Sequence, residues 1–190
     1  SKSEKIEDRV RDAFTGLNPA YSIVMLTTDG LIGVRDPSEV RPLHLGRIGE
    51  KAWVLASETV AFDSIRAKPE GEVKGGEMVL INNDGIKRYQ IFEPAQRQRC
   101  IFCPIYFARP DSFIFENTVS NGTIRQEFGR QLYRKHPAEA DFIIPVPDSS
   151  NHAALGYSEE SFKQGKGIPF AFGLTRSHYI GRTFIEPTQA

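Results

Sequence analysis

Cysteine and long apolar runs are both scarce in this chain. Its two cysteines among 190 residues are too few for the disulfide framework of a small secreted protein. No apolar run approaches the roughly 20 residues that cross a bilayer, and no segment resembles a secretory signal. These absences predict a protein of a reducing compartment, the cytoplasm, with no membrane partner.

The chain also carries no excess of charge of either sign. Lysine and arginine together number 24, as do aspartate and glutamate, so the net charge is zero. A nucleic-acid partner held by bulk positive charge is therefore not expected. The 39% apolar and 25% charged residues are typical of a soluble globular protein, with enough chain for one large domain or two small ones.

Signatures of the common hydrolases and nucleotide-binding enzymes are missing as well. No Ser-His-Asp set, paired carboxylates or Walker loop can be recognised. His44, His136 and His152 stand alone without the spacing of metal ligands, so we expect them at the surface or at helix caps. The function has to be inferred from other patterns.

The first half of the chain has the pattern of hairpins flanked by helices. Apolar residues at helical spacing predict a helix over residues 3–14 with Ser3 as N-cap, and a shorter helix over 58–66. Asp29-Gly30 and Asn83-Asp84-Gly85 each separate two strand-like runs, as short hairpin turns do. With a further strand in AWVLAS, the sequence up to about residue 92 predicts an antiparallel sheet with helices against it.

The second half changes rhythm after residues 93–99, a polar segment with a proline that is typical of a linker. Strand-like runs (CIFCPIYF, DFIIPV, IPFAFG) then alternate with helical ones, which predicts a βαβ series. DFIIPV is apolar throughout and suits a buried parallel strand. The helix over 123–135 has an apolar face at Ile124, Phe128 and Leu132. We therefore predict two domains, residues 1–94 and 95–190.

Cys100 and Cys103 form a C-x-x-C pair inside the run CIFCPIYF. A closed zinc site usually takes four ligands, and no second pair exists. A redox pair is typical of a helix N-terminus, whereas this run has the composition of a buried strand. Metal and redox use stay open as alternatives, and two partly buried thiols are the favoured interpretation.

The stretch PVPDSSNHAALGY places Asp148, Ser149, Ser150 and Asn151 between a predicted buried strand and a predicted helix. Ligands bind at that edge of open α/β sheets, and the N–H groups in the first turn of a helix favour anions. Serine and asparagine are also ordinary N-caps, which is the alternative interpretation.

Near the C-terminus, TRSHYIGRTFIEPTQ concentrates Arg176, Tyr179 and Arg182 within seven residues. Planar guanidinium groups bind two phosphate oxygens at once, and a loop of this composition can close over a phosphorylated substrate. The alternative is a surface loop with solvated arginines. If the segment folds over the bend at Asp148, the two form one pocket for a sugar phosphate.

Taken in order, several stretches resemble the glutamine phosphoribosylpyrophosphate amidotransferase family. They cover nearly the whole chain: AYSIVMLT, LIGVRDP, VLASETVAFD, GEMVLIN, YFARPDS, IPVPDSSNHAALGY, GIPFAFGL and HYIGRTFIEPTQ. The resemblance implies an α+β domain followed by an α/β domain. Residues 1–94 would be the C-terminal part of an N-terminal-nucleophile αββα glutaminase domain. Residues 95–190 would be the N-terminal part of a type I phosphoribosyltransferase domain.

The resemblance also implies a glycosyltransferase activity. In the family, a cysteine thiolate releases ammonia from glutamine. The ammonia displaces pyrophosphate from C1 of phosphoribosylpyrophosphate, with Mg present, and the product 5-phosphoribosylamine opens purine biosynthesis. The implied partners are phosphoribosylpyrophosphate, glutamine and purine nucleotides as inhibitors, and the implied state is a homo-oligomer.

Individual residues carry over from the family's mobile loop. Tyr179 and Arg182 match it directly, and Arg176 takes a position usually held by lysine. These three are expected to bind the substrate, together with Asp148 and Ser150 of the preceding bend.

Two further matches concern cofactors. Ser149 matches a residue associated with the Mg site and with nucleotide binding. Some members carry a [4Fe-4S] cluster, and Cys100 matches the first of its four cysteine ligands. Members without a cluster also have a cysteine there, so the match does not decide between them.

The chain departs from the family in several places. The family's nucleophilic cysteine and its phosphoribosylpyrophosphate loop have no match within these residues, so the 190-residue chain is expected to be catalytically incomplete. The alternative is a non-catalytic structural or nucleotide-binding piece. Glu39 replaces a glycine, Cys103-Pro104 a Glu-Tyr pair and residues 121–126 a helical stretch, while residues 162–166 look inserted.

Overall fold

The computed structural model describes residues 3–17, 20–116, 118–177 and 179. The chain forms two compact units, Ser1–Gly122 and Thr123–Ala190. The segment that follows residue 94 therefore packs with the first unit as far as Gly122, beyond the boundary expected at residue 95. The assignment of the two family domains to residues 1–94 and 95–190 stays a prediction.

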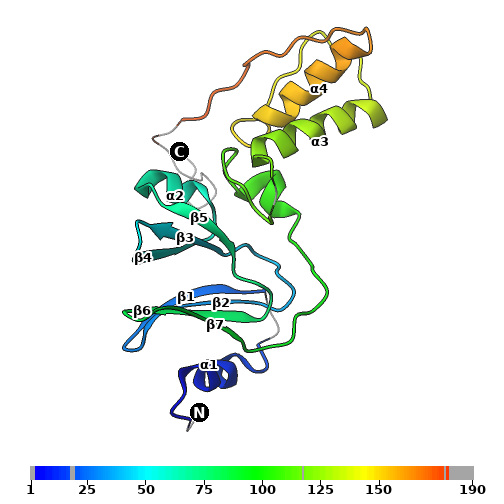
Figure 1. Ribbon diagram of the computed structural model, residues 1–190. Coiled ribbons are helices and arrows are strands. Elements are labelled where there is room, and N and C mark those ends of the chain that lie inside the picture. The colour runs from blue at the N-terminus through cyan, green and yellow to red at the C-terminus, as the bar shows by residue number, and fades with distance from the viewer. Residues whose placement is uncertain (1–2, 18–19, 117, 178, 180–190) are drawn as a thin grey trace. The chain divides into compact units, whose positions relative to one another are not determined.

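The first unit has four layers, helix, sheet, sheet, helix (Figure 1). One sheet has the order β1-β2-β6-β7 and the other the order β4-β3-β5, and all pairs are antiparallel. Helix α1 (Ile6–Phe14) covers the first sheet and α2 (Val60–Ile65) covers the second. The strands are β1 (Ser22–Thr27), β2 (Gly30–Arg35), β3 (His44–Ile48), β4 (Ala52–Ala56), β5 (Lys68–Glu72), β6 (Glu77–Asn82) and β7 (Gly85–Gln90).

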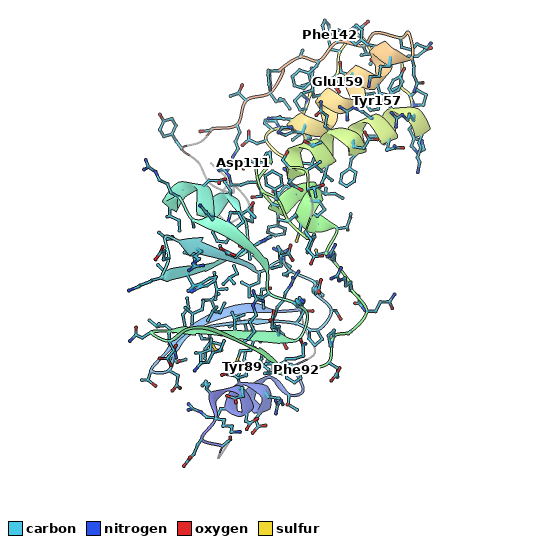
Figure 2. The ribbon with its side chains drawn as sticks, in the orientation of Figure 1. Tyr89, Phe92, Asp111, Phe142, Tyr157 and Glu159 are labelled. Carbon is cyan, nitrogen blue, oxygen red and sulfur yellow. The ribbon has the colours of Figure 1, made fainter. Side chains whose placement is uncertain are left out.

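Apolar side chains hold these layers together. Val10 and Phe14 of α1 lie in one core with Ile32 and Met78 of the sheet, and Tyr89 and Phe92 pack against that core (Figure 2).

Between the sheets, Gly33 leaves no room for a Cβ, because the Leu55 side chain lies there. Phe62 of α2 fills the equivalent space over Gly46 of β3.

Both predicted hairpins are confirmed, with a small shift in each, because the glycine of each predicted turn already belongs to the strand that follows. Thr27 pairs with Gly30, so the turn residues are Thr28 and Asp29, and Gly30 with φ 137° already belongs to β2. In the second, Asn82 pairs with Gly85 across Asn83 and Asp84.

Ser3 is not the N-cap of α1: the cap position is Lys5, whose N–H donates to Ser3 Oγ at 3.2 Å.

Two strands were not predicted. β5 contains a proline and a glycine, which normally argue against a strand, but it lies at the edge of its sheet, where such residues are tolerated. β3 has only two hydrophobic residues in His44–Ile48 and becomes the central strand because β4 and β5 pair with it on either side.

The run CIFCPIYF is helical, which corrects the predicted buried strand. A wide helical turn spans Cys103–Phe107, with the Ala108 N–H donating to the Cys103 carbonyl at 2.9 Å. Pro104 lies in the first turn of this helix, where its missing N–H leaves no bond unmade. The β-branched and aromatic composition was therefore a weaker signal than the position of the proline.

The predicted linker is docked along its length. The N–H groups of Ala95, Gln98 and Cys100 donate to the carbonyls of Pro37, Ser38 and Val40 at 3.0, 2.8 and 3.0 Å. The segment 95–100 therefore lies beside the turn that follows β2 and belongs to the packed structure of the first unit.

The second unit is built on α3 (Asn121–Lys135) and α4 (Asn151–Lys163). The two helices touch through glycine: a Cβ on Gly129 would meet the Ala153 carbonyl, and one on Gly156 would meet the Gln126 carbonyl. Glu159 of α4 accepts hydrogen bonds from Gln126 and Arg130 of α3 (Figure 2). Among the described residues, no helix is long and apolar enough to cross a membrane.

Two predictions for the second unit are wrong. Phe128 and Leu132 of α3 are exposed, while Gly129 and Tyr133 form the buried face, because the glycine contact turns that face toward α4. DFIIPV is not a buried strand: Ile143 makes a single parallel bridge to Phe170, and Val146 is 68% exposed. The parallel direction of this contact is as predicted.

Candidate functional site

The bend before α4 carries the predicted anion site. The Asn151 N–H donates to the Asp148 carbonyl at 3.3 Å, and the Ser150 hydroxyl donates back to the Val146 carbonyl. Ser150 occupies the N-cap position but makes no side-chain capping bond. The first-turn N–H groups of α4 are therefore not capped by Ser150, which weakens the alternative interpretation of this residue as an ordinary cap.

The structure brings one arginine of the C-terminal segment to this bend. Arg176 Nη1 lies 3.5 Å from Asp148 Oδ2, and about half of each side chain is exposed, 49% and 52%. Tyr179 is fully exposed and does not join them. Arg182 lies outside the described residues. Of the predicted substrate residues, Arg176, Asp148 and Ser150 are thus gathered in the second unit.

The chemistry of this group is that of an open anion site. Arg176 supplies a guanidinium fork, the start of α4 supplies N–H groups, and the long Arg176–Asp148 contact leaves the fork able to take a second partner. The side chains of Asp148, Ser149 and Ser150 add oxygen atoms of the kind that coordinate cations. In the described part of the chain, no three His, Cys, Asp or Glu side chains cluster closely enough to hold a metal by themselves.

A second polar site in the first unit was missed by the sequence reasoning. Glu58 Oε2 accepts hydrogen bonds from the Arg109 N–H at 2.8 Å and from Ser112 Oγ at 2.6 Å. A cavity of about 380 Å³ opens here, lined by Ser57, Glu58, Val60, Ala61, Ser64 and Arg109. The signal was available: ASET and FARPDS are both family-like stretches, but nothing in their spacing says that they meet.

A buried ion pair lies where β2 leads into the following turn. Arg35 Nη1 lies 2.6 Å from Glu72 Oε2, and both side chains are almost fully buried. His44, which was expected at the surface or at a helix cap, is instead buried in β3 with Nε2 3.8 Å from Glu72 Oε1. Burial lowers the pKa of His44, although the Glu72 carboxylate opposes this, so the imidazole is neutral at pH 7.

Cys100 and Cys103 form a close, unequal pair. Burial raises the pKa of Cys103 to about 11. Burial also acts to raise the pKa of Cys100, but hydrogen bonds from the N–H groups of Phe102 and Cys103, and from Arg41, hold it below its ordinary value. A [4Fe-4S] cluster takes four thiolates. The match of Cys100 to one of these ligands therefore stays a prediction, and no cluster chemistry is assigned to it here.

No family model matches the chain. Comparison with individual proteins, in contrast, finds relatives along its whole length. It is 45% identical over 189 residues to amidophosphoribosyltransferase 1, chloroplastic, of Arabidopsis thaliana, a match that covers 100% of this chain and 32% of that protein. It is 39% identical over 185 residues to the amidophosphoribosyltransferase of Bacillus subtilis, covering 97% of this chain and 37% of the relative.

Solved structures agree with these sequences. The glutamine phosphoribosylpyrophosphate amidotransferase from B. subtilis complexed with ADP and GMP superposes with a TM-score of 0.87 at 38% identity, over 100% of this chain and 40% of that one. The chain spans 31–38% of the length of the curated relatives it matches. Over that span it belongs to the amidophosphoribosyltransferase family, as its motifs predicted.

Proposed function

We propose that this chain is part of an amidophosphoribosyltransferase. In this enzyme, ammonia from glutamine displaces pyrophosphate from C1 of phosphoribosylpyrophosphate, and the product is 5-phosphoribosylamine. The observation that carries the proposal is the meeting of Arg176 with Asp148, which joins the arginine segment to the bend before α4. The similarity to amidophosphoribosyltransferases along the whole chain supports it.

In this proposal the bend and the arginine segment bind the sugar phosphate. Arg176 binds phosphate oxygens in place of its contact with Asp148, and Tyr179 and Arg182 complete the contact. A magnesium ion bound with the substrate would neutralise phosphate charge. Asp148 and Ser149 are the residues of this bend that would hold it, since Mg²⁺ takes one or two protein oxygens and fills its shell with water and phosphate. The protein works in the cytoplasm as an oligomer of identical chains.

A purine nucleotide is the second candidate ligand. It is favoured by the B. subtilis relative, which is described as complexed with ADP and GMP. A nucleoside monophosphate shares its ribose 5-phosphate with phosphoribosylpyrophosphate, so one anion site suits both. The 190 residues alone are expected to bind rather than to turn over, because the family's nucleophile and pyrophosphate loop have no match in them.

Thermal unfolding with and without ligand tests the site. With phosphoribosylpyrophosphate and Mg at ten times the dissociation constant, binding to the native state adds roughly 1.4 kcal/mol. For a chain of this size that corresponds to a rise in Tm of about 3–6 °C. We expect the rise in the wild type and its loss in Arg176→Ala. GMP in the same titration distinguishes nucleotide binding from substrate binding.

Lys166→Ala is the matched control, because it also removes one positive charge from the second unit but lies away from the bend. It should keep the full ligand-induced rise. An equal response of Arg176→Ala and the wild type, or no rise with either ligand, would contradict the proposed site.

A further inference from the structure

A buried cluster of charged and titratable side chains joins β2, β3 and β5 in the first unit. Glu72 of β5 has its Oε2 2.6 Å from Arg35 Nη1 and its Oε1 3.8 Å from His44 Nε2. None of these three side chains is more than 6% exposed. The Arg35 guanidinium also donates to the carbonyls of Arg41 and Val73 at 2.9 and 2.8 Å, so the main chain holds it independently of Glu72.

The Glu72 carboxylate also holds a segment with a strained backbone. Its Oε1 accepts the Glu116 N–H at 2.8 Å. Phe115 and Glu116 have φ angles of 57° and 59°, in the left-handed region that is unfavourable for residues with a Cβ. Arg99 adds two contacts, with its guanidinium 5.4 Å from the Phe115 ring centroid and Nη2 3.0 Å from the Glu116 carboxylate. Contacts of this kind keep residues 115–116 in their conformation.

His44 is the member of the cluster whose ordinary pKa lies near neutral pH. Its Nε2 is buried and finds no hydrogen-bond partner among the described residues. Burial lowers the pKa of His44; the carboxylates of Glu72 on β5 and of Glu58 just before α2 act against this, and the Arg35 charge on β2 acts with it. The other neighbour, β4, carries no titratable side chain. A proton on His44 is therefore disfavoured while the imidazole stays where it is.

We propose that His44 and Glu72 form an acid-sensitive catch for residues 115–116. At neutral pH, Glu72 Oε1 holds the Glu116 N–H. In acid, the protonated imidazole of His44 closes the 3.8 Å gap and takes this oxygen in a charge-assisted hydrogen bond. Oε2 stays with Arg35, while Oε1 turns away from the Glu116 N–H. Without that bond, Phe115 and Glu116 leave the left-handed conformation.

The direction of the pH effect follows from where the proton binds more tightly. In the released form the imidazolium has Glu72 as a direct partner, whereas in the held form it would be a buried charge without one. Acid therefore favours the released form. The held form predominates at neutral pH and gives way as the pH falls below 6.5, the ordinary pKa of histidine. Because the first unit ends at Gly122, shortly after this segment, the catch links pH to the stretch of chain that leaves the unit.

Amide hydrogen exchange of the folded chain, followed by NMR and corrected for the intrinsic effect of pH, tests the proposal. Between about pH 7.5 and about pH 5, protection of the Glu116 amide should fall at least about tenfold, since one linked proton shifts an equilibrium up to tenfold per pH unit. The Ile91 amide, which donates to the Gly76 carbonyl at 3.0 Å, should stay protected, which separates local release from unfolding. Constant protection of Glu116, or an equal loss at Ile91, would overturn the proposal.

Two variants identify the sensor. His44→Gln keeps a polar side chain that cannot be protonated, and it should make the protection of Glu116 independent of pH. His136→Gln removes an exposed imidazole from the second unit and should keep the wild-type loss. A His44→Gln protein that loses protection in acid as the wild type does would contradict the catch.

The wild type alone provides a second test, which does not depend on the folding of any variant. The C–H signals of the His44 imidazole, recorded in the same samples, should titrate over the pH range in which Glu116 loses protection. A titration of His44 in a different pH range from the loss at Glu116 would separate the two events and overturn the proposal.

Discussion

Glu39 replaces a glycine of the family, and its backbone still has a conformation that suits glycine. Its φ of 54° lies in the left-handed region that favours glycine. The side chain has acquired contacts of its own: Arg97 Nε lies 3.0 Å and Arg99 Nη2 3.6 Å from its carboxylate, which also accepts the Gly75 N–H at 3.3 Å. The ion pairs therefore offset a strained backbone and attach residues 97–99 to the turn.

Replacement of Glu39 separates these two effects. Glu39→Ala loses the contacts but keeps the strain, and we expect it to destabilise the first unit by about 2 kcal/mol. Glu39→Gly loses the same contacts without the strain and should be more stable than Glu39→Ala by roughly 1 kcal/mol. Urea unfolding followed by circular dichroism measures both.

The exposed Glu70→Ala serves as the control for Glu39 and should stay within about 0.5 kcal/mol of the wild type. If Glu39→Ala proved as stable as Glu39→Gly, the positive φ would carry no measurable cost.

Single residues also mark the limit of what the sequence could predict for the site. Asp148 and Arg176 were both singled out by chemistry that is local to the sequence, a bend before a helix and an arginine-rich segment. Glu58 was not, because its partners Arg109 and Ser112 lie more than 50 residues away and only the fold brings them together. Local chemistry can be inferred from sequence, whereas long-range pairing cannot.

At the scale of elements, the contact between α3 and α4 shows why the predicted helix face was wrong. An apolar face at Ile124, Phe128 and Leu132 is the usual signal of burial. Here Gly129 and Gly156 bring the two backbones so close that small residues define the interface instead. The hairpins were easier to predict, because a turn depends on neighbouring residues and not on a partner element.

Gly129→Ala and Gly156→Ala test this close contact. Alanine in place of glycine normally stabilises a helix by about 1 kcal/mol. Here the new methyl group would strike the backbone of the opposite helix, so we expect each change to destabilise the second unit by roughly 1–3 kcal/mol. Thermal unfolding monitored at the helix signal measures the sign.

Gln131→Ala, on the exposed side of α3, is the matched control for the two glycine changes and should leave the second unit almost unchanged. A stabilising effect of either glycine substitution would mean that the helices are farther apart than the structure has them.

At the scale of the whole molecule, the second unit exposes a row of apolar side chains. Phe142, Ile144 and Val146 alternate along one segment and are 60%, 50% and 68% exposed. Their apolar composition predicted burial. Among the described residues, however, neighbouring atoms cover only part of the surface of these three side chains. A patch of this kind favours association with other chains.

We therefore expect the chain to associate in a concentration-dependent way. Val146→Glu places a charge in the middle of the row and should shift the population toward the monomer, as measured by light scattering after size-exclusion chromatography. Lys166→Glu changes charge on a polar part of the same unit and should have little effect. A wild type that stays monomeric at every concentration would remove the support for association through this row.

The docking of residues 95–100 on the turn after β2 has a mechanical consequence. Three main-chain hydrogen bonds join two segments that run in the same direction. A force that pulls one segment along the other loads all three bonds at once, whereas a force across them would open one bond after another. Tension transmitted along the chain at this point is thus resisted jointly by the three bonds.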